Sequence, residues 1–269
     1  GIRDVAVTGV QTCALPICSG RRLFDSHFHV IDHRFPLVAN QGYAPPPFSL
    51  ADYRSAANPL GVQGGAVVSG SFQAFDQSYL LAALAALGPG WVGVTQIPED
   101  CPDAEIARLG AAGVRAVRFN IVRGGAGDFD RIKALARRCH AVAGWHCELY
   151  VDAATLASEV DRLAGLPKVS IDHLGMTEAG LPVLLRLVEA GVHVKATGFG
   201  RVKLDVAKAL EAIAATDPAM LVFGTDMPST RAPRPFEAAD IDLVETVLGA
   251  ELAQRVFWDN ALALYRVTA

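Results

Sequence analysis

Short apolar runs alternate with amphipathic segments from residue 24 to the end of the chain. Eight of these runs have the length and composition of buried strands, and each is followed by a segment with the 3.6-residue period of a helix. The predicted strands cover residues 24–30, 65–69, 91–97, 114–121, 145–151, 169–173, 192–197 and 220–226. The predicted helices cover residues 49–58, 76–87, 103–110, 128–143, 153–163, 181–190, 204–215, 240–248 and 250–265.

This alternation predicts an α/β protein with a parallel sheet and right-handed crossovers. Eight such units in a chain of 269 residues indicate a closed (β/α)8 TIM barrel rather than an open doubly wound sheet. The Gly-x-Gly-x-x-Gly pattern expected after the first strand of a dinucleotide-binding fold is absent. A long irregular loop, residues 33–48, follows the first strand and has the length of a functional lid.

The N-terminal segment fits none of these elements. Residues 4–18 have neither helical nor strand periodicity, and residues 7–17 resemble the translation of a sequencing-adaptor oligonucleotide. We therefore expect residues 1–20 to be a non-native artefact, the native start to lie near Arg21, and residues 21–269 to form a single barrel domain. In that case Cys13 and Cys18 carry no meaning for the fold.

Composition excludes several classes of protein. The net charge is -4 with no long run of one sign, which gives no electrostatic footprint for nucleic acid or an acidic membrane surface. No apolar run reaches the roughly 18 residues of a membrane span. Five irregularly spaced cysteines form neither a zinc ribbon nor a disulfide framework, so we expect a cytoplasmic protein with reduced thiols. The oligomeric state is left open, a homo-oligomer included.

The first predicted strand carries the strongest candidate chemistry. Because side chains alternate along a strand, Asp25, His27 and His29 are expected on one face and the intervening apolar residues on the other. Leaving such groups buried and unpaired would cost about 1–3 kcal/mol each. The two imidazoles are close enough to grip a divalent metal or a polarised carbonyl oxygen. On this pattern alone, a pair of hydrogen-bonded core histidines explains the spacing equally well.

Polar residues also follow the other strands at their C-terminal ends, where barrel active sites lie. They are Ser71 after the second strand, Arg118, Asn120 and Arg123 at the fourth, Glu148 and Tyr150 on the fifth, Asp172 and His173 at the sixth, Lys195 and then Arg201 at the seventh, and Thr225 and Asp226 at the eighth. Closure of the barrel would bring these groups together.

Several of these residues have two readings. Asp226 either caps a turn or acts chemically, and we favour chemistry because no helix starts after it. Arg118, half-buried in its strand, requires an anionic partner, which is either a ligand or a protein group such as Glu148. Lys195 is expected to have a structural role, through pairing with Asp25 or by extending its amine toward solvent.

This set resembles the amidohydrolase superfamily of barrel hydrolases, through the His27-x-His29 pair, His173 and Asp226. Within it, three segments resemble the branch that contains 2-pyrone-4,6-dicarboxylate lactonase and sugar-lactone lactonases: 117–120, 172–175 and 224–228. Residues 257–261 resemble the family's usual ending.

The resemblance implies hydrolysis of a lactone or similar ester. Binuclear members have a bridging lysine on strand four and a metal-binding histidine on strand five, where this chain has Arg118 and Tyr150. We therefore expect either no metal or one zinc or manganese ion held by His27, His29 and Asp226. The pyrone lactonase branch implies the version without a metal.

The leading hypothesis is a hydrolase that opens a lactone of a small, anionic, carboxylated substrate. Asp226 would act as the general base, while His27, His29 and His173 polarise the carbonyl. Substrate binding is assigned to Arg118, Arg123, Tyr150 and Ser71. One alternative is a metal-dependent decarboxylase of aromatic acids on the same barrel, and another is a non-catalytic binding relative.

Overall fold

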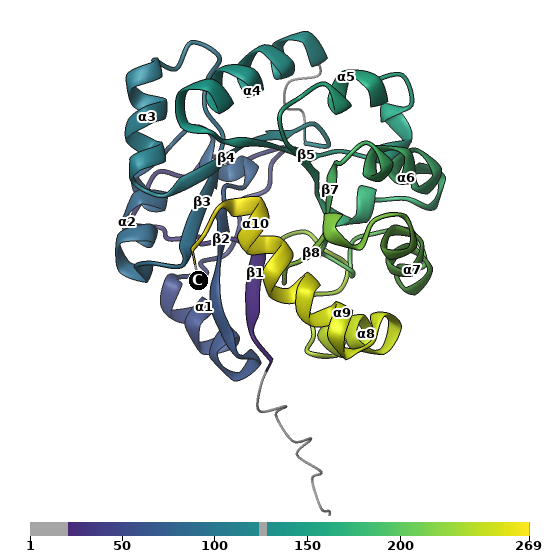
Figure 1. Cartoon of the computed structure of the whole chain (residues 1–269). Helices are drawn as coiled ribbons and strands as arrows, with labels where there is room; N and C mark the ends of the chain where they lie inside the picture. Colours follow the sequence, from purple (N-terminus) through teal and green to yellow (C-terminus); the bar gives the residue numbers. More distant parts are fainter. Residues whose placement is uncertain (1–20, 124–127, 269) are drawn as a thin grey trace, which may run out of the picture.

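The computed structural model describes residues 21–123 and 128–268, and the expectation for residues 1–20 lies outside them. Within the described residues, eight parallel strands follow one another around a barrel in chain order, with the helices outside it (Figure 1). The (β/α)8 prediction is confirmed. The strands are β1 (Leu23–Phe28), β2 (Val62–Val68), β3 (Trp91–Thr95), β4 (Val114–Asn120), β5 (His146–Tyr150), β6 (Val169–Ile171), β7 (His193–Ala196) and β8 (Leu221–Phe223).

Most helices match the periodic segments of the sequence. The expected helix over 153–163 is instead a 3-10 turn (Ala153–Leu156) followed by a short helix, and the expected helix over 250–265 is divided by a π-helical turn (Arg255–Asp259). The helices are α1 (Leu50–Ala57), α2 (Ser78–Leu87), α3 (Asp103–Ala111), α4 (Phe129–Ala143), α5 (Val160–Ala164), α6 (Leu181–Glu189), α7 (Val206–Thr216), α8 (Ala239–Leu248), α9 (Ala250–Gln254) and α10 (Asn260–Tyr265). Local sequence explains their starts: Ser49 and Asp52 form a reciprocal capping box at α1, and the Asp128 side chain caps α4. None of the helices in the described residues is long and apolar enough to cross a membrane.

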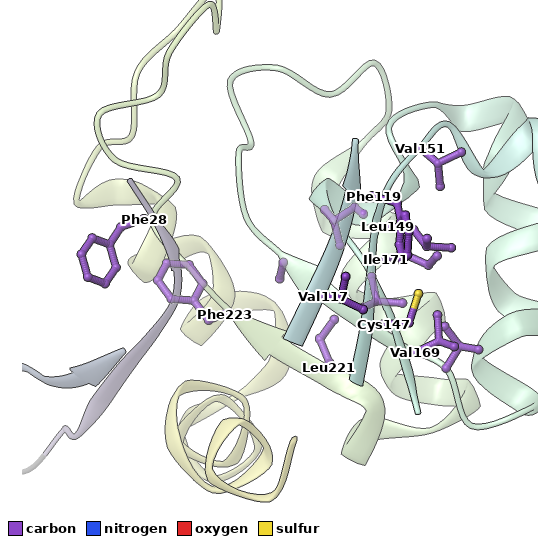
Figure 2. Close-up of a cluster of buried hydrophobic side chains, with 14 of the residues drawn as sticks. Phe28, Val117, Phe119, Cys147, Leu149, Val151, Val169, Ile171, Leu221 and Phe223 are labelled. Carbon is purple, nitrogen blue, oxygen red and sulfur yellow. The ribbon is translucent and has the colours of Figure 1, made fainter. Parts of the chain in front are cut away.

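The core has two layers, one outside and one inside the strands. Outward-facing side chains such as Val117, Leu149 and Ile171 pack under the helices, as Figure 2 shows for part of this cluster. Inside, Phe24, Val94 and other apolar residues of β1–β4 and β8 pack against the C-terminal helix. Helix α10 lies across this end of the barrel (Figure 1), with Tyr265 stacked on Phe24 at a ring-centroid distance of 5.5 Å. The barrel is therefore filled at the end opposite the site.

Strand β1 departs from the predicted alternation. Three residues of β1 span the distance covered by two of β2 between the pairs Asp25–Gly65 and Phe28–Val67, so β1 contains a bulge. The expectation that Asp25 shares a face with His27 is wrong. Asp25 instead accepts a hydrogen bond from Tyr53 Oη of α1 (3.0 Å), while His27 points into the barrel. Phe28 likewise points outward and stacks on Tyr53.

The barrel closes between β1 and β8 at the level of the candidate site. Asp226 N donates to His27 O (2.7 Å), and His29 N donates to Met227 O (2.8 Å). Gly224 is required for this approach, because a Cβ there would lie 2.7 Å from His27 N. The closure thus fixes the backbones that carry both histidines and the aspartate.

Candidate functional site

Three side chains from the closing strands converge at the C-terminal end of the barrel. His27 Nε2 and His29 Nε2 each lie 3.8 Å from Asp226 Oδ1. His173, which follows β6, completes the cluster, since its ring centroid is 4.9 Å from that of His27. The structure therefore brings together the four residues that the sequence assigned to catalysis.

Asp25, which lies on the outer side of the strands, links the segment before His27 to the segment before Asp226. Its carboxylate accepts hydrogen bonds from Thr225 N (2.8 Å), Thr225 Oγ1 (2.7 Å) and His27 N (3.2 Å). Burial is the dominant influence on this group and raises the pKa of Asp25 to about 6, despite these donors. Asp25 therefore positions the segments before His27 and Asp226, although it does not face the site.

Arg201 binds Asp226, a contact that the sequence did not predict. Arg201 Nε donates to Asp226 Oδ2 (2.8 Å), and Nη2 binds the same oxygen. Burial acts to raise the pKa of Asp226, but Arg201 and the neighbouring imidazoles outweigh it and hold that pKa well below the usual range. Asp226 is therefore ionised at neutral pH, and its Oδ1 has no hydrogen-bond donor in the described part of the chain.

The histidines of the cluster have different hydrogen bonds. His29 Nδ1 lies 2.7 Å from Val68 O, a carbonyl that can only accept, so in the neutral ring the proton is assigned to Nδ1 and Nε2 carries a lone pair. Burial lowers the pKa of His27 to about 4, the effect of Asp172 opposing it, and burial holds the pKa of His173 well below its usual range. Both rings are therefore neutral at pH 7.

The two site residues that follow β6 and β8 have left-handed backbones. His173 has φ 51° and Asp226 has φ 61°, values that a non-glycine residue adopts at a cost and that cluster at functional sites. Gly198 makes room for His173, since a Cβ there would lie 2.6 Å from His173 Nδ1 and 3.0 Å from Arg201 Nε. These turns aim the imidazole and the carboxylate into the barrel mouth.

A small cavity lies above the cluster. It has about 30 Å³ of free volume, which holds a water molecule but not a lactone. The residues that line it are His29, Tyr43, Gly70, Ser71, Phe72, Arg118, Asn120, Arg123, Tyr150, His173, Arg201, Asp226, Thr230 and Arg231. Arg231 closes one side, with its guanidinium 4.4 Å from the centroid of the Tyr43 ring in the loop after β1. A substrate therefore has to displace side chains at the mouth.

The buried charges below the cavity pair differently from two of the expectations. Arg118 binds Asp172 through Nε (3.0 Å) and Nη2 (2.8 Å), rather than Glu148. Lys195 binds Glu148 at 2.5 Å rather than Asp25, which faces outward because of the β1 bulge. Arg118 still lines the cavity, with Nη1 bonded to Ser69 O (3.0 Å).

The distances between the donors of the cluster are those that one divalent ion requires. His27, His29 and Asp226 offer nitrogen and oxygen atoms within 4.8 Å of one another, and zinc or manganese takes such a set. The orphaned Nε2 of His27 and Oδ1 of Asp226 lie at this position. A second group, His27, Asp172 and His173, satisfies the same distance, but Arg118 already neutralises Asp172.

Fold and site together define a (β/α)8-barrel enzyme with an imidazole and carboxylate centre at the C-terminal ends of its strands. The chain belongs to the amidohydrolase family, whose model matches residues 24–267.

Relatives of known name extend over nearly the whole chain. It is 27% identical over 273 residues to 2-pyrone-4,6-dicarboxylate hydrolase of Comamonas testosteroni, covering 90% of this chain and 89% of the relative. It is also 27% identical over 271 residues to D-galactarolactone isomerase of Agrobacterium fabrum, covering 92% of each. The crystal structure of ATU3138 from Agrobacterium tumefaciens superposes with a TM-score of 0.81 at 25% identity, over 92% of this chain and 97% of that one.

The four residues assigned to substrate binding also reach the cavity: Arg118, Arg123, Tyr150 and Ser71 all line it. Arg201, Arg231 and Tyr43 line it as well. The sequence placed Arg201 among the polar groups at the strand ends, from its position just beyond the seventh strand, but assigned it no role, and it did not single out Arg231 or Tyr43 as site residues.

Proposed function

We propose that this protein is a hydrolase that opens a lactone of a small carboxylated substrate. The observation that carries the proposal is the ionised Asp226, whose Oδ1 faces two imidazoles at 3.8 Å beneath a cavity lined by four arginines. A general base, groups that polarise a carbonyl and cations for an anionic substrate are the components such hydrolysis needs.

In the proposed reaction, a water molecule attacks the lactone carbonyl carbon while Asp226 takes one of its protons. The tetrahedral oxyanion that forms is stabilised by N–H groups of His27 and His173. The ring carbon–oxygen bond then breaks, and Asp226 returns the proton to the leaving oxygen, which gives a hydroxy acid. His29, whose Nε2 lacks a proton in the neutral ring, serves as an acceptor that orients the water.

The arginines favour a substrate with carboxylate groups. Arg118 and Arg201 are held by Asp172 and Asp226, whereas the side chains of Arg123 and Arg231 have no carboxylate partner among the described residues. Guanidinium groups bind carboxylates with matched geometry, so Arg123 and Arg231 are assigned to the substrate anion. Tyr150 and Ser71, at the cavity wall, are assigned to further hydrogen bonds with it.

The relatives support the same substrate class. The Comamonas testosteroni protein is named for hydrolysis of a pyrone dicarboxylate and the Agrobacterium fabrum protein for isomerisation of a sugar-acid lactone. Both names describe a small lactone, so the same class is proposed here. Ring opening and ring rearrangement share activation of the lactone carbonyl and differ in whether water or a substrate hydroxyl attacks.

A metal has one suitable position in this scheme. His27, His29 and Asp226 would hold a zinc or manganese ion, which would supply a Lewis acid to polarise the carbonyl. We propose the version without a metal, because Arg201 already compensates the charge of Asp226.

The test is a panel of pyrone and sugar-acid lactones with one or two carboxylates, together with carboxylated arenes. Purified protein is incubated with each compound, and acid release, lactone rearrangement and carbon dioxide are measured. Acid release from a carboxylated lactone, lost in Asp226→Asn, is the expected result. Carbon dioxide release from the arenes would replace the proposal by the decarboxylase, and rearrangement without acid release would make the protein an isomerase.

A further inference from the structure

A buried ion pair lies inside the barrel directly below the cluster. Lys195 of β7 and Glu148 of β5 are both 0% exposed, and Lys195 Nζ is 2.5 Å from Glu148 Oε2. The other carboxylate oxygen of Glu148 accepts from Tyr265 Oη of α10 (2.8 Å) and lies 3.0 Å from His146 Nε2. The carboxylate is therefore fixed from three sides and holds the lysine in one place.

Stability alone does not account for this pair. Removing two charges from water costs several kcal/mol each, and well-packed apolar residues in their place are often neutral or stabilising. The lower part of the barrel interior along β1–β4 and β8 is built that way, with residues such as Val92, Val94 and Val222. The position of Lys195 is more informative, because its Nζ lies 3.5 Å from His27 Nδ1.

The chemistry of Lys195 determines which atom donates and which accepts in its contact with His27. An ammonium group can only donate hydrogen bonds, so His27 Nδ1 is the acceptor and the single proton of the neutral ring is assigned to Nε2. Asp172 Oδ1 lies 3.4 Å from the same nitrogen and 3.6 Å from Lys195 Nζ, so this carboxylate oxygen is paired with the same ammonium group. Asp172 is also bound through Oδ2 by Arg118.

We propose that Lys195, held by Glu148, is a positioning residue that keeps the proton of His27 on Nε2. His27 then presents an N–H group to Asp226 Oδ1 and to the site, whereas His29 presents a lone pair because its Nδ1 is bonded to Val68 O. The His27-x-His29 pair thus supplies one donor and one acceptor from a repeated residue type.

This arrangement opposes metal binding at the cluster. A metal-bound His27 would need its lone pair on Nε2 and its proton on Nδ1, where the proton would face the Lys195 ammonium. Loss of Lys195 would free Nδ1–H to bond Asp172 Oδ1, the carboxylate and histidine arrangement typical of metal ligands.

The direct test reads the tautomer of His27 without any substrate. The protein is labelled with ¹⁵N-histidine, the His27 signals are assigned by comparison with His27→Asn, and two-bond ¹H–¹⁵N spectra identify the protonated nitrogen. The expected result is a protonated Nε2 and an unprotonated Nδ1 in the wild type. A protonated Nδ1 would overturn the proposal.

Two variants then identify the cause. Glu148→Gln/Lys195→Met removes the pair without changing the net charge, and it should move the proton to Nδ1 and tighten zinc binding in solution at least tenfold. Asp172→Asn removes the competing acceptor and should leave the proton on Nε2. Lys168→Met, at a partly buried lysine whose amine bonds Ala263 O, is the matched control with no change expected. Movement of the proton in Asp172→Asn, or its retention in the double variant, would overturn the role of Lys195.

The consequence for catalysis rests on the proposed function. The tautomer spectra do not depend on that function. With a lactone that the protein hydrolyses, the double variant should lose about 10²-fold in kcat with KM within about threefold, since one donor to the oxyanion is lost. If no lactone is hydrolysed but the spectra agree, the proposed function fails and the role of Lys195 stands. If the double variant does not fold, the wild-type and Asp172→Asn spectra decide between the two arrangements.

Discussion

Replacement of Asp226 by asparagine tests the chemistry most directly. Asp226 is the one carboxylate among the described residues that line the cavity, so no neighbouring acid can replace it as the base. Positioned general bases contribute about 10²–10⁴-fold to rate, and Asp226→Asn should lower kcat/KM for the lactone by that amount. The substrate-binding arginines are untouched, so KM should change little.

The same variant has a predictable effect on stability. Arg201 loses an ionised partner but retains Thr230 O, to which its Nη2 donates at 3.2 Å. Breaking a fully buried ion pair costs about 3–5 kcal/mol, and the Arg201 side chain is 8% exposed at the cavity, so we expect a loss at or below the low end of that range. Thermal unfolding of the variant and wild type measures this, and Asp217→Asn, at a capping aspartate before β8, is the matched control.

The pH profile supplies a second measurement on the same residue. Because Arg201 holds the pKa of Asp226 well below its usual range, the acid limb of kcat/KM in the free enzyme should lie below pH 4. A base with the pKa of the buried His27 would place that limb near pH 4, and a histidine with an ordinary pKa would place it near pH 6 to 7. An acid limb at pH 4 or above, or an Asp226→Asn variant with more than a few per cent of wild-type activity, would refute the assignment of Asp226.

Three further results are expected. Asp25→Asn should be more stable than wild type by about 3 kcal/mol above pH 6 and by little below pH 4. The reason is that the raised pKa of Asp25 makes the folded wild type lose stability as pH rises between these values. Urea unfolding at a series of pH values measures the difference in unfolding free energy, and a difference that does not change with pH would contradict the prediction. Arg123→Met should raise KM for a carboxylated lactone about tenfold or more at nearly constant kcat, whereas Arg137→Met on the outer face of α4 should not, as steady-state kinetics would show. Prolonged chelation should leave turnover unchanged, with metal content checked by elemental analysis; loss of activity restored by zinc or manganese would establish the metal-dependent version.

The barrel was predictable because its signal is local. Each strand is a short apolar run and each helix has its own periodicity, so strand order and closure followed from counting units. The rule that barrel sites lie at the C-terminal ends of the strands then selected His27, His173 and Asp226, which are far apart in sequence. Their approach to a common point required no knowledge of side-chain conformations.

The pairing of the buried charges was not predictable in the same way. Whether Arg118 reaches Glu148 or Asp172 depends on the stagger of the strands and on the rotamer of the arginine. The register between β4 and β5 places Arg118 beside Glu148, but the guanidinium group of Arg118 bonds Asp172. The outward turn of Asp25 depends on one extra residue in β1, and the sequence Phe24–Val30 alternates except at Ser26, which does not by itself indicate a bulge. A one-residue bulge reverses the face of every side chain on one side of it.

The division of the barrel interior explains why such pairs had to form. The lower part of the inner wall is apolar along β1–β4 and β8, whereas β5, β6 and β7 contribute Glu148, Ser170 and Lys195 to it. A charge on this polar side cannot reach water, because α10 covers the lower end and the site covers the upper one, so each must find a partner across the barrel. Tyr265 of α10 contacts this network through Glu148, so an unbroken chain of contacts runs from the C-terminal helix through Lys195 to His27.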